Sequence, residues 1–300
     1  MPTVPPSIFK AYDIRGVDEK ELTPDIAELI GRGYGTYLWR LGTRDAIIAR
    51  DTRRTSEEYE QRLINGLLST GVNAHHIGHA FTPTVYWSRK NYSIDGGVIV
   101  TASHNPPEYN GFKLCHGYNT MSGDEVQKIR EIIQRNDFET GKGLTKEIPE
   151  ANDLYWKALK NRAGKFEKPM RIVVDCTNGT SSLFFPKKLR EMGLKDTTIN
   201  ETVDPSFPGH LPDPAFIAGY EGLQKKVVEV GADLGIMLDT DVDRVGFVDD
   251  RGKLWLGDMI LILLSRDYLP MSPGAKVIVE LKDSEAVVDE VTRLGGRPIF

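Results

Sequence analysis

Two loops in this sequence carry residues that could do chemistry. The first reads TASHNPPEYNGFK (residues 101–113) and follows a short apolar run, GGVIV, which predicts a buried strand. Pro106 and Pro107 can neither continue a strand nor open a helix directly, so Ser103 must lie on a stiff turn at the end of that strand. Open α/β sheets bind their ligands at such strand ends, which makes Ser103 the centre of a candidate site.

The second loop reads LDTDVDRVG (residues 238–246) and sets three aspartates at alternate positions between two apolar runs. Carboxylates as close as those of Asp239, Asp241 and Asp243 repel one another, and a bound divalent cation would remove that cost. Oxygen ligands of this kind suit Mg²⁺ or Mn²⁺ and leave coordination positions for water or phosphate. Arg244 beside them could balance charge or hold a phosphate through two hydrogen bonds.

Two other interpretations of the second loop are open. An EF-hand calcium loop needs glycine at its sixth position, where this chain has Arg244, and glutamate at its twelfth, where it has Asp250. A haloacid-dehalogenase-type site is closer, because IMLDTDV resembles that superfamily's strand and D-x-D-x-(T/V) motif. Asp239 would then be the nucleophile and Asp241 the acid/base. That motif usually opens its domain, however, and here another apolar strand, VGFVDD, follows at once.

Taken together, five motifs resemble the α-D-phosphohexomutases, most closely their phosphomannomutase/phosphoglucomutase branch. In chain order they are KAYDIRG (10–16), TASHNP (101–106), NGFK (110–113), DPSFPGHLPDP (204–214) and ADLGIMLDTDVDRVG (232–246). The metal loop of that family usually reads D-G-D-G-D-R, whereas this chain has Thr240 and Val242 in place of the glycines. Side chains at these two positions restrict the backbone, which could change metal affinity or loop mobility.

The resemblance implies an isomerase, an intramolecular phosphotransferase that converts hexose 1-phosphate to hexose 6-phosphate reversibly. The reaction would pass through a phosphoserine and a hexose 1,6-bisphosphate, which also serves as activator. By the same resemblance the catalytic residues are Ser103, His104, Lys113 and Arg15. The expected substrate contacts are Tyr12, Arg15, Lys113, Arg244 and Lys282. The expected Mg²⁺ ligands are Asp239, Asp241, Asp243 and a phosphoryl oxygen on Ser103.

The neighbours Ser103 and His104 raise the question of a serine hydrolase. Side chains of adjacent residues rarely face each other, so we expect these two to point apart. No other partner for a catalytic triad is evident from the sequence, and a Ser–His hydrolase is therefore disfavoured.

Strands alternate with helices along the chain. Short apolar runs at 46–49, 98–100, 171–175, 234–238, 245–250 and 276–281 predict strands. Three residue pairs give helix-start signals, and they are Thr23 with Pro24, Thr55 with Glu58, and Ser122 with Glu125. This alternation predicts a multidomain α/β protein in which each domain has a mixed, largely parallel sheet between helices.

Two breaks suggest the domain limits. Residues 139–169 are rich in Gly, Lys and Glu and predict a linker, and residues 252–257 form a second boundary. We therefore expect a domain with the phosphoserine loop at 1–145, one with the metal loop at 146–254, and the start of a third, sugar-binding domain at 255–300. About 45 residues cannot easily bury an α/β core, since a domain of about 60 residues is already marginal.

The resemblance adds an expectation about length. The family has four domains, so the third domain looks truncated and the fourth absent. We therefore expect this chain alone to turn over far more slowly than a complete homologue. An incomplete chain that binds sugar phosphate without catalysis remains an alternative.

Composition narrows the remaining possibilities. The net charge is −5 and no run of five like charges occurs, which argues against a nucleic-acid surface. The most apolar window, MILILL, is too short to span a bilayer, and the first residues have no signal-peptide core. The two cysteines suggest no disulfide framework. These features predict a cytoplasmic protein that binds neither nucleic acid nor a membrane. The resemblance implies a hexose phosphate as its partner, with neither the hexose nor the oligomeric state specified.

Overall fold

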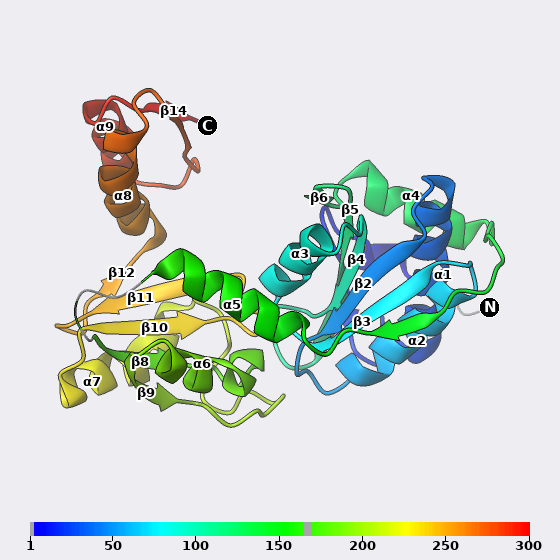
Figure 1. Ribbon diagram of the computed structural model, residues 1–300, viewed down its shortest axis with the longest axis horizontal. Helices are drawn as coiled ribbons and strands as arrows, with labels where there is room; N and C mark the ends of the chain where they lie inside the picture. The colour runs from blue at the N-terminus through cyan, green and yellow to red at the C-terminus, as the bar shows by residue number, and fades with distance from the viewer. Residues whose placement is uncertain (1–2, 165–167, 169) are drawn as a thin grey trace.

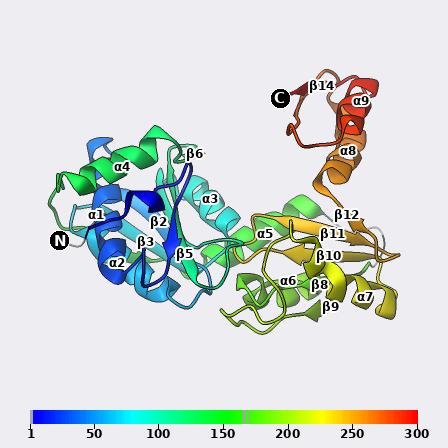
Figure 2. The same cartoon turned by 180° about the vertical axis from the view of Figure 1, so that it is seen from behind.

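The computed structural model describes residues 3–164, 168 and 170–300. Within these residues the strands form three sheets, each in its own α/β unit (Figures 1 and 2). The sheets confirm the predicted α/β class and its mixed pairing, although parallel and antiparallel pairs are equally common in the two larger sheets. Among the described residues, no helix combines the length and apolarity that crossing a membrane requires.

The first unit holds a sheet in the order β1-β5-β4-β2-β3-β7, with β6 paired to β5. Strands β4, β2, β3 and β7 are parallel, and β1 and β5 run antiparallel to their neighbours. The strands are β1 (Ile14–Val17), β2 (Asp45–Arg50), β3 (Asn73–His79), β4 (Gly96–Val100), β5 (Tyr109–His116), β6 (Asn119–Thr120) and β7 (Thr145–Glu147). The helices are α1 (Pro24–Arg40), α2 (Ser56–Leu68), α3 (Thr82–Asn91), α4 (Asp124–Gln134) and α5 (Ala151–Ala163).

Helices cover both faces of this first sheet, because successive strand side chains point to opposite sides. In β2, Ala46 and Ile48 join the core beneath α1, α2 and α4, whereas Ile47 and Ala49 join the core beneath α3 and α5. Both faces are thus buried, as for the parallel sheets of other α/β proteins. The loops after β2 and β4 emerge at the same edge, since those strands are parallel.

The second unit has the sheet order β12-β11-β10-β8-β9, in which β10, β8 and β9 are parallel. The strands are β8 (Arg171–Asp175), β9 (Lys195–Ile199), β10 (Leu234–Leu238), β11 (Val245–Asp249) and β12 (Leu254–Trp255). Helix α6 (Phe185–Glu191) covers one face, and α7 (Glu221–Val230) covers the other. The antiparallel hairpin of β10 and β11 carries the acidic loop at its tip.

The third unit is small and lies beyond β12 in both views (Figures 1 and 2). It consists of α8 (Gly257–Tyr268), β13 (Lys276–Ile278), α9 (Glu285–Arg293) and β14 (Arg297–Ile299). Its strands are parallel, and its buried core is Leu269, Val279, Val287 and Val291. Short 3₁₀ turns lie at Pro6–Ile8, Thr180–Leu183 and Ile217–Tyr220 in the two larger units and at Leu269–Met271 in the third.

The predicted strands are present, although that expected at 276–281 ends at Ile278. Thr23 caps α1 as predicted, accepting a hydrogen bond from the backbone N–H of Ile26. The prediction of a capping box at Thr55 was wrong, because the Thr55 hydroxyl donates to Asp18 Oδ2 at 2.7 Å and does not cap α2. The Thr55 hydroxyl thus makes its hydrogen bond to a buried carboxylate and not to a backbone N–H at the start of the helix.

The prediction of a linker at 139–169 was wrong for the residues of that stretch that the structure describes. Strand β7 extends the first sheet, and α5 packs against α3. Trp156 of α5 is buried between Phe81 of the first unit and Phe185 of the second, with ring centroids 6.1 and 5.2 Å away. The composition of this stretch did not predict a packed helix, because few apolar residues hold α5 in place. Residues 165–167 and 169 of the predicted linker lie outside the described residues.

Candidate active site

Ser103 lies where the two large units meet. It follows β4, is only 2% exposed, and has a left-handed backbone with φ of +51°. Non-glycine residues rarely adopt this conformation, which persists only where neighbours hold it. Here the Ser103 N–H donates to Thr101 Oγ1 at 2.8 Å.

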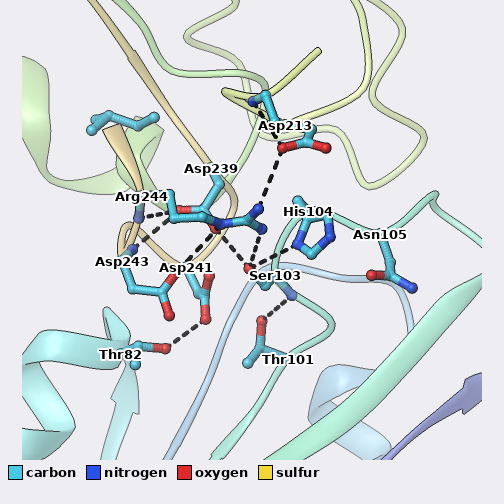
Figure 3. A network of polar contacts seen from close by, with 12 residues as sticks. Thr82, Thr101, Ser103, His104, Asn105, Asp213, Asp239, Asp241, Asp243 and Arg244 are labelled. Carbon is cyan, nitrogen blue, oxygen red and sulfur yellow. Dashed lines mark hydrogen bonds and ion pairs between the residues drawn. The ribbon is translucent and has the colours of Figure 1, made fainter. Parts of the chain in front are cut away.

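The Ser103 hydroxyl joins the two predicted loops. It donates to Asp239 Oδ2 at 2.7 Å and accepts from Arg244 Nη2 at 2.9 Å (Figure 3). These partners are 136 and 141 residues away in sequence. The strand ends of both sheets thus build one site, as expected for α/β units.

His104 corrects one expectation. Its Nδ1 lies 3.4 Å from Ser103 Oγ, so the adjacent side chains face each other (Figure 3). We expected them to point apart, as they would on extended or helical backbone. The left-handed turn at Ser103 brings the two side chains together. At 3.4 Å the contact is long for a hydrogen bond, so it is weak in this geometry.

The three aspartates of the second loop form an acidic cluster. Their carboxylate oxygens lie within 4.8 Å of one another, and Asp239 and Asp241 are fully buried. Burial, reinforced by the charges of Asp241 and Asp243, raises the pKa of Asp239 well above its usual range. Burial alone would also raise the pKa of Asp241, but the Lys113 ammonium and the hydrogen bonds from Lys113 and Thr82 together outweigh burial and hold that pKa low.

Lys113 supplies the countercharge from the first unit. It lies on β5, and its Nζ donates to Asp241 Oδ2 at 2.6 Å and also to Asp243 Oδ2. Burial would lower the pKa of Lys113, but the two carboxylates outweigh burial and raise it. Lys113 is therefore a cation shared by two members of the acidic cluster.

The acidic cluster fits a divalent cation. Asp241 Oδ1 is buried and has no hydrogen-bond partner, although an orphaned buried carboxylate oxygen is costly. Three carboxylates with a free oxygen are the donor set that Mg²⁺ or Mn²⁺ prefers. The residues that would hold the ion are Asp239, Asp241 and Asp243.

Two arginines flank the serine. Arg244 Nε lies 3.3 Å from Asp239 Oδ2, and its Nη1 lies 3.4 Å from Asp213 Oδ1. Burial, aided by the nearby charge of Arg15, lowers the pKa of Arg244 to about 10. Arg15 on β1 donates to Asp13 Oδ2 and Asn105 Oδ1, both at 2.6 Å. Both guanidinium groups thus lie where a phosphate on Ser103 would need positive charge.

A cavity of about 360 Å³ opens beside these groups. It is lined by Tyr12, Arg15, Tyr86, Ser103, His104, Lys113, Thr120, Asp243 and Arg244. Tyr12 is 66% exposed at its rim. A larger cavity of about 600 Å³ beside α7 contains none of the predicted site residues.

Lys282 is the one predicted site residue that the structure brings neither to this cavity nor to the acidic cluster. Its side chain is 88% exposed in the loop after β13, and its Nζ lies 3.3 Å from Glu280 Oε1. Its role as a substrate contact stays a prediction.

Three residues that contact the site were missed from the sequence. Thr82, at the start of α3, donates through its backbone N–H to the carbonyl of Asp241 and through Oγ1 to Asp241 Oδ2. Asp213 contacts Arg244, and Arg53 underlies the serine loop. Asp213 stands in a motif the sequence did single out, whereas only the tertiary fold reveals Thr82 and Arg53.

The two residues that replace glycine in the acidic loop behave differently. Val242 has φ of +58°, a left-handed conformation that is strained for a β-branched side chain. Thr240 is fully buried, and its Oγ1 has no hydrogen-bond partner. The expected backbone restriction thus falls on Val242.

Comparisons with known proteins match the chain in two segments. The family models described as phosphoglucomutase/phosphomannomutase, alpha/beta/alpha domain I and domain II match residues 6–140 and 153–252. The chain is 35% identical over 299 residues to the phosphomannomutase/phosphoglucomutase of Pseudomonas aeruginosa, covering 100% of this chain and 64% of that relative. It is 33% identical over 302 residues to the phosphoglucomutase of Neisseria meningitidis serogroup B, covering 100% and 65%.

A solved structure agrees. The crystal structure of a phosphoglucomutase/phosphomannomutase family protein from Burkholderia thailandensis superposes with a TM-score of 0.94 at 32% identity. The match covers 99% of this chain and 66% of the other. The chain thus spans slightly less than two thirds of the length of these relatives.

Proposed function

The chain belongs to the phosphoglucomutase/phosphomannomutase family, as its motifs predicted, and from this we propose that it interconverts hexose 1-phosphates and hexose 6-phosphates through a phosphoserine at Ser103. One observation carries the proposal. The Ser103 hydroxyl contacts Asp239 of the acidic cluster at 2.7 Å and Arg244 at 2.9 Å. A serine so placed has both a divalent cation site and a guanidinium against the group it would carry.

In the proposed cycle, phosphorylated Ser103 gives its phosphoryl group to a hydroxyl of a hexose monophosphate. The bond to Ser103 Oγ breaks as the bond to the sugar oxygen forms, which yields a hexose 1,6-bisphosphate. The bisphosphate then returns its other phosphoryl group to Ser103 and leaves as the isomeric monophosphate. Added hexose 1,6-bisphosphate would act as activator, because it can phosphorylate an empty serine.

Protons must move in the opposite direction to the phosphoryl group. The sugar hydroxyl loses a proton as Ser103 Oγ gains one. His104 Nδ1, 3.4 Å from Oγ, is placed to exchange that proton with the serine. Lys113 and Arg15 line the same cavity and would stabilise the charge on the phosphoryl oxygens and on the sugar phosphate. Tyr12 at the rim would contact the sugar.

A bound Mg²⁺ supplies charge neutralisation at the phosphoryl oxygens. Asp239, Asp241 and Asp243 would hold it together with a phosphoryl oxygen on Ser103, and Asp241 Oδ1 is the buried oxygen left free for it. Thr82 orients Asp241, and Arg244 orients Asp239.

The geometry does not favour the dehalogenase-type alternative. Asp239 Oδ1 accepts from the backbone N–H groups of Asp243 and Arg244 at 3.1 and 3.0 Å. Its Oδ2 accepts from Ser103 and is bonded by Arg244 Nε. A fully buried carboxylate with both oxygens engaged in hydrogen bonds is poorly placed to attack as a nucleophile. An EF-hand is disfavoured too, because β10 and β11 flank the loop.

Turnover tests the proposal. Glucose 1-phosphate and mannose 1-phosphate are each incubated with the chain, Mg²⁺ and a trace of glucose 1,6-bisphosphate, and formation of the 6-phosphate is followed. We expect slow conversion by the wild-type chain, none by Ser103→Ala, and an unchanged rate for the exposed control Ser122→Ala. Conversion by Ser103→Ala at the wild-type rate would refute the serine's role. A wild-type chain that converts neither sugar would favour the binding-only alternative.

The remaining expectations belong to the same proposal. We propose domain limits at 1–145, 146–254 and 255–300, with the serine loop in the first and the acidic cluster in the second; β7, which pairs in the first sheet, spans the first limit. We also propose a cytoplasmic location and a hexose phosphate as the partner.

A further inference from the structure

Arg53 lies directly beneath the serine loop. It follows β2, and its side chain is only 1% exposed. Its Nη2 donates to the carbonyls of Ser103 at 2.8 Å and Asn105 at 2.6 Å. Its Nη1 donates to the carbonyls of Pro106 at 2.8 Å and Tyr109 at 3.0 Å. One guanidinium thus binds four carbonyls along a single loop.

The guanidinium is itself fixed by its surroundings. Arg53 Nε lies 3.4 Å from Oδ2 of the fully buried Asp51. Asp51 Oδ1 in turn accepts from the Arg53 N–H at 2.9 Å and from Ser56 Oγ at 2.5 Å. From the second unit, the ring of Phe207 packs over the guanidinium, with its centroid 5.1 Å from Cζ. The plane of the group therefore cannot rotate freely.

An arginine suits this position for a chemical reason. Guanidinium carries five N–H groups in a rigid fork, of which four are bonded to loop carbonyls and the fifth, at Nε, lies near Asp51. No Nη N–H remains for a phosphate, and Nε, which has no hydrogen-bond partner, is buried 3.4 Å from Asp51 Oδ2, so Arg53 must act through the loop. Ser103 needs that restraint because its left-handed backbone is unfavourable for a residue with a side chain.

We infer that Arg53 is a positioning residue, which holds the 103–109 loop so that Ser103 Oγ stays against Asp239 and Arg244. This inference rests on the proposed function, since it concerns the same serine. Lysine has three donors on a flexible stem and cannot hold four carbonyls at once. A displacement of the nucleophile by about 1 Å can reduce a rate on the order of a hundredfold.

The experiment follows phosphate loading of Ser103. Wild type, Arg53→Lys and Arg89→Lys are mixed with Mg²⁺ and glucose 1,6-bisphosphate, and the phosphorylated peptide is quantified over time by mass spectrometry. Arg89 is a matched control: it is buried in the same unit and donates to the carbonyls of Asp95 and Gly117, away from the serine loop. Rates are normalised to the folded fraction from circular dichroism.

We expect Arg53→Lys to load Ser103 about a hundredfold more slowly than wild type. Arg89→Lys should load it within about threefold of wild type. Amide hydrogen exchange of residues 101–109 should rise in Arg53→Lys alone. A merely structural arginine would lower stability without this local exchange or a selective loss of loading.

Other results would overturn the inference. Loading by Arg53→Lys within about threefold of wild type would do so, as would equal slowing by Arg89→Lys. If Arg53→Lys fails to fold, Asp51→Asn tests the same point, because it keeps the arginine but weakens its anchor; wild-type loading by Asp51→Asn would then overturn the inference. If the wild-type chain never loads Ser103, the proposed function fails together with the inference. If wild type loads Ser103 and only the comparison of the variants fails, the inference alone is overturned.

Discussion

Replacing Thr82 with valine tests whether the first unit orients the acidic cluster of the second. Thr82 is fully buried at the first residue of α3, and its Oγ1 donates to Asp241 Oδ2 at 2.5 Å. Its backbone N–H also donates to the Asp241 carbonyl at 3.0 Å. Valine has nearly the same shape as threonine, so Thr82→Val removes the side-chain bond and keeps the backbone bond.

The expected loss follows from the charge on Asp241. A hydrogen bond to a charged group contributes about 1.5–3 kcal/mol to stability. Asp241 is fully buried, its Oδ1 has no partner, and Lys113 is the other side chain that donates to its Oδ2 among the described residues. Water cannot replace the lost hydroxyl there, so we expect Thr82→Val to lower the free energy of unfolding by about 2 kcal/mol.

The chain provides a matched control in Thr84. It lies on the same helix and is equally buried, but its Oγ1 has no hydrogen-bond partner. Replacing an unpaired buried hydroxyl by a methyl should be neutral or stabilising. Urea unfolding of wild type, Thr82→Val and Thr84→Val should therefore show a loss only for Thr82→Val. Equal stability of the two variants would refute the claim that Thr82 clamps the acidic cluster.

Three further predictions concern stability. At the left-handed position 242, Val242→Gly should be about 1 kcal/mol more stable than Val242→Ala in urea, and equal stability would argue against strain. The carboxylates of Glu60, 3.1 Å from Nε2, and of Glu147, which accepts from Nδ1 at 2.8 Å, raise the pKa of His76 to about 9. The stability that protonated His76 contributes is complete below its ordinary pKa of about 6.5 and is lost as the pH rises through 9. His76→Gln should therefore reduce the change of melting temperature with pH between these values. An unchanged dependence of the melting temperature on pH would contradict this. Phe81 is buried against aromatic rings of α5 and α6, so Phe81→Ala should cost about 3–5 kcal/mol in thermal unfolding, and a loss below about 1 kcal/mol would show that this contact contributes little.

The sequence predicted those parts of the candidate site whose residues lie next to one another in the chain. The serine loop follows a five-residue apolar run, and the three aspartates alternate between two such runs. Short parallel strands end at one edge of a sheet, so both loops could be placed at strand ends before any contact was known. In the structure Ser103 Oγ lies 2.7 Å from Asp239 Oδ2, as those placements imply.

Contacts that depend on distant partners could not be predicted. Thr55 has the pattern of a helix cap, yet Asp18, 37 residues earlier, takes its hydroxyl. Arg53 sits in an ordinary polar loop, and only the folded chain shows that it binds four carbonyls some 50 residues later. His104 was misjudged because the positive φ of Ser103 is set by its neighbours and not by its residue type.

The measurement that tests the central claim most directly is the location of the covalent phosphate. The chain is incubated with Mg²⁺ and glucose 1,6-bisphosphate, kept under conditions that preserve acyl phosphates, and digested for mass spectrometry. We predict phosphate on Ser103, and none on that peptide in Ser103→Ala. Phosphate on Asp239 would contradict the account and support the dehalogenase-type chemistry, and a chain that takes up no phosphate would contradict its role as a phosphoryl carrier.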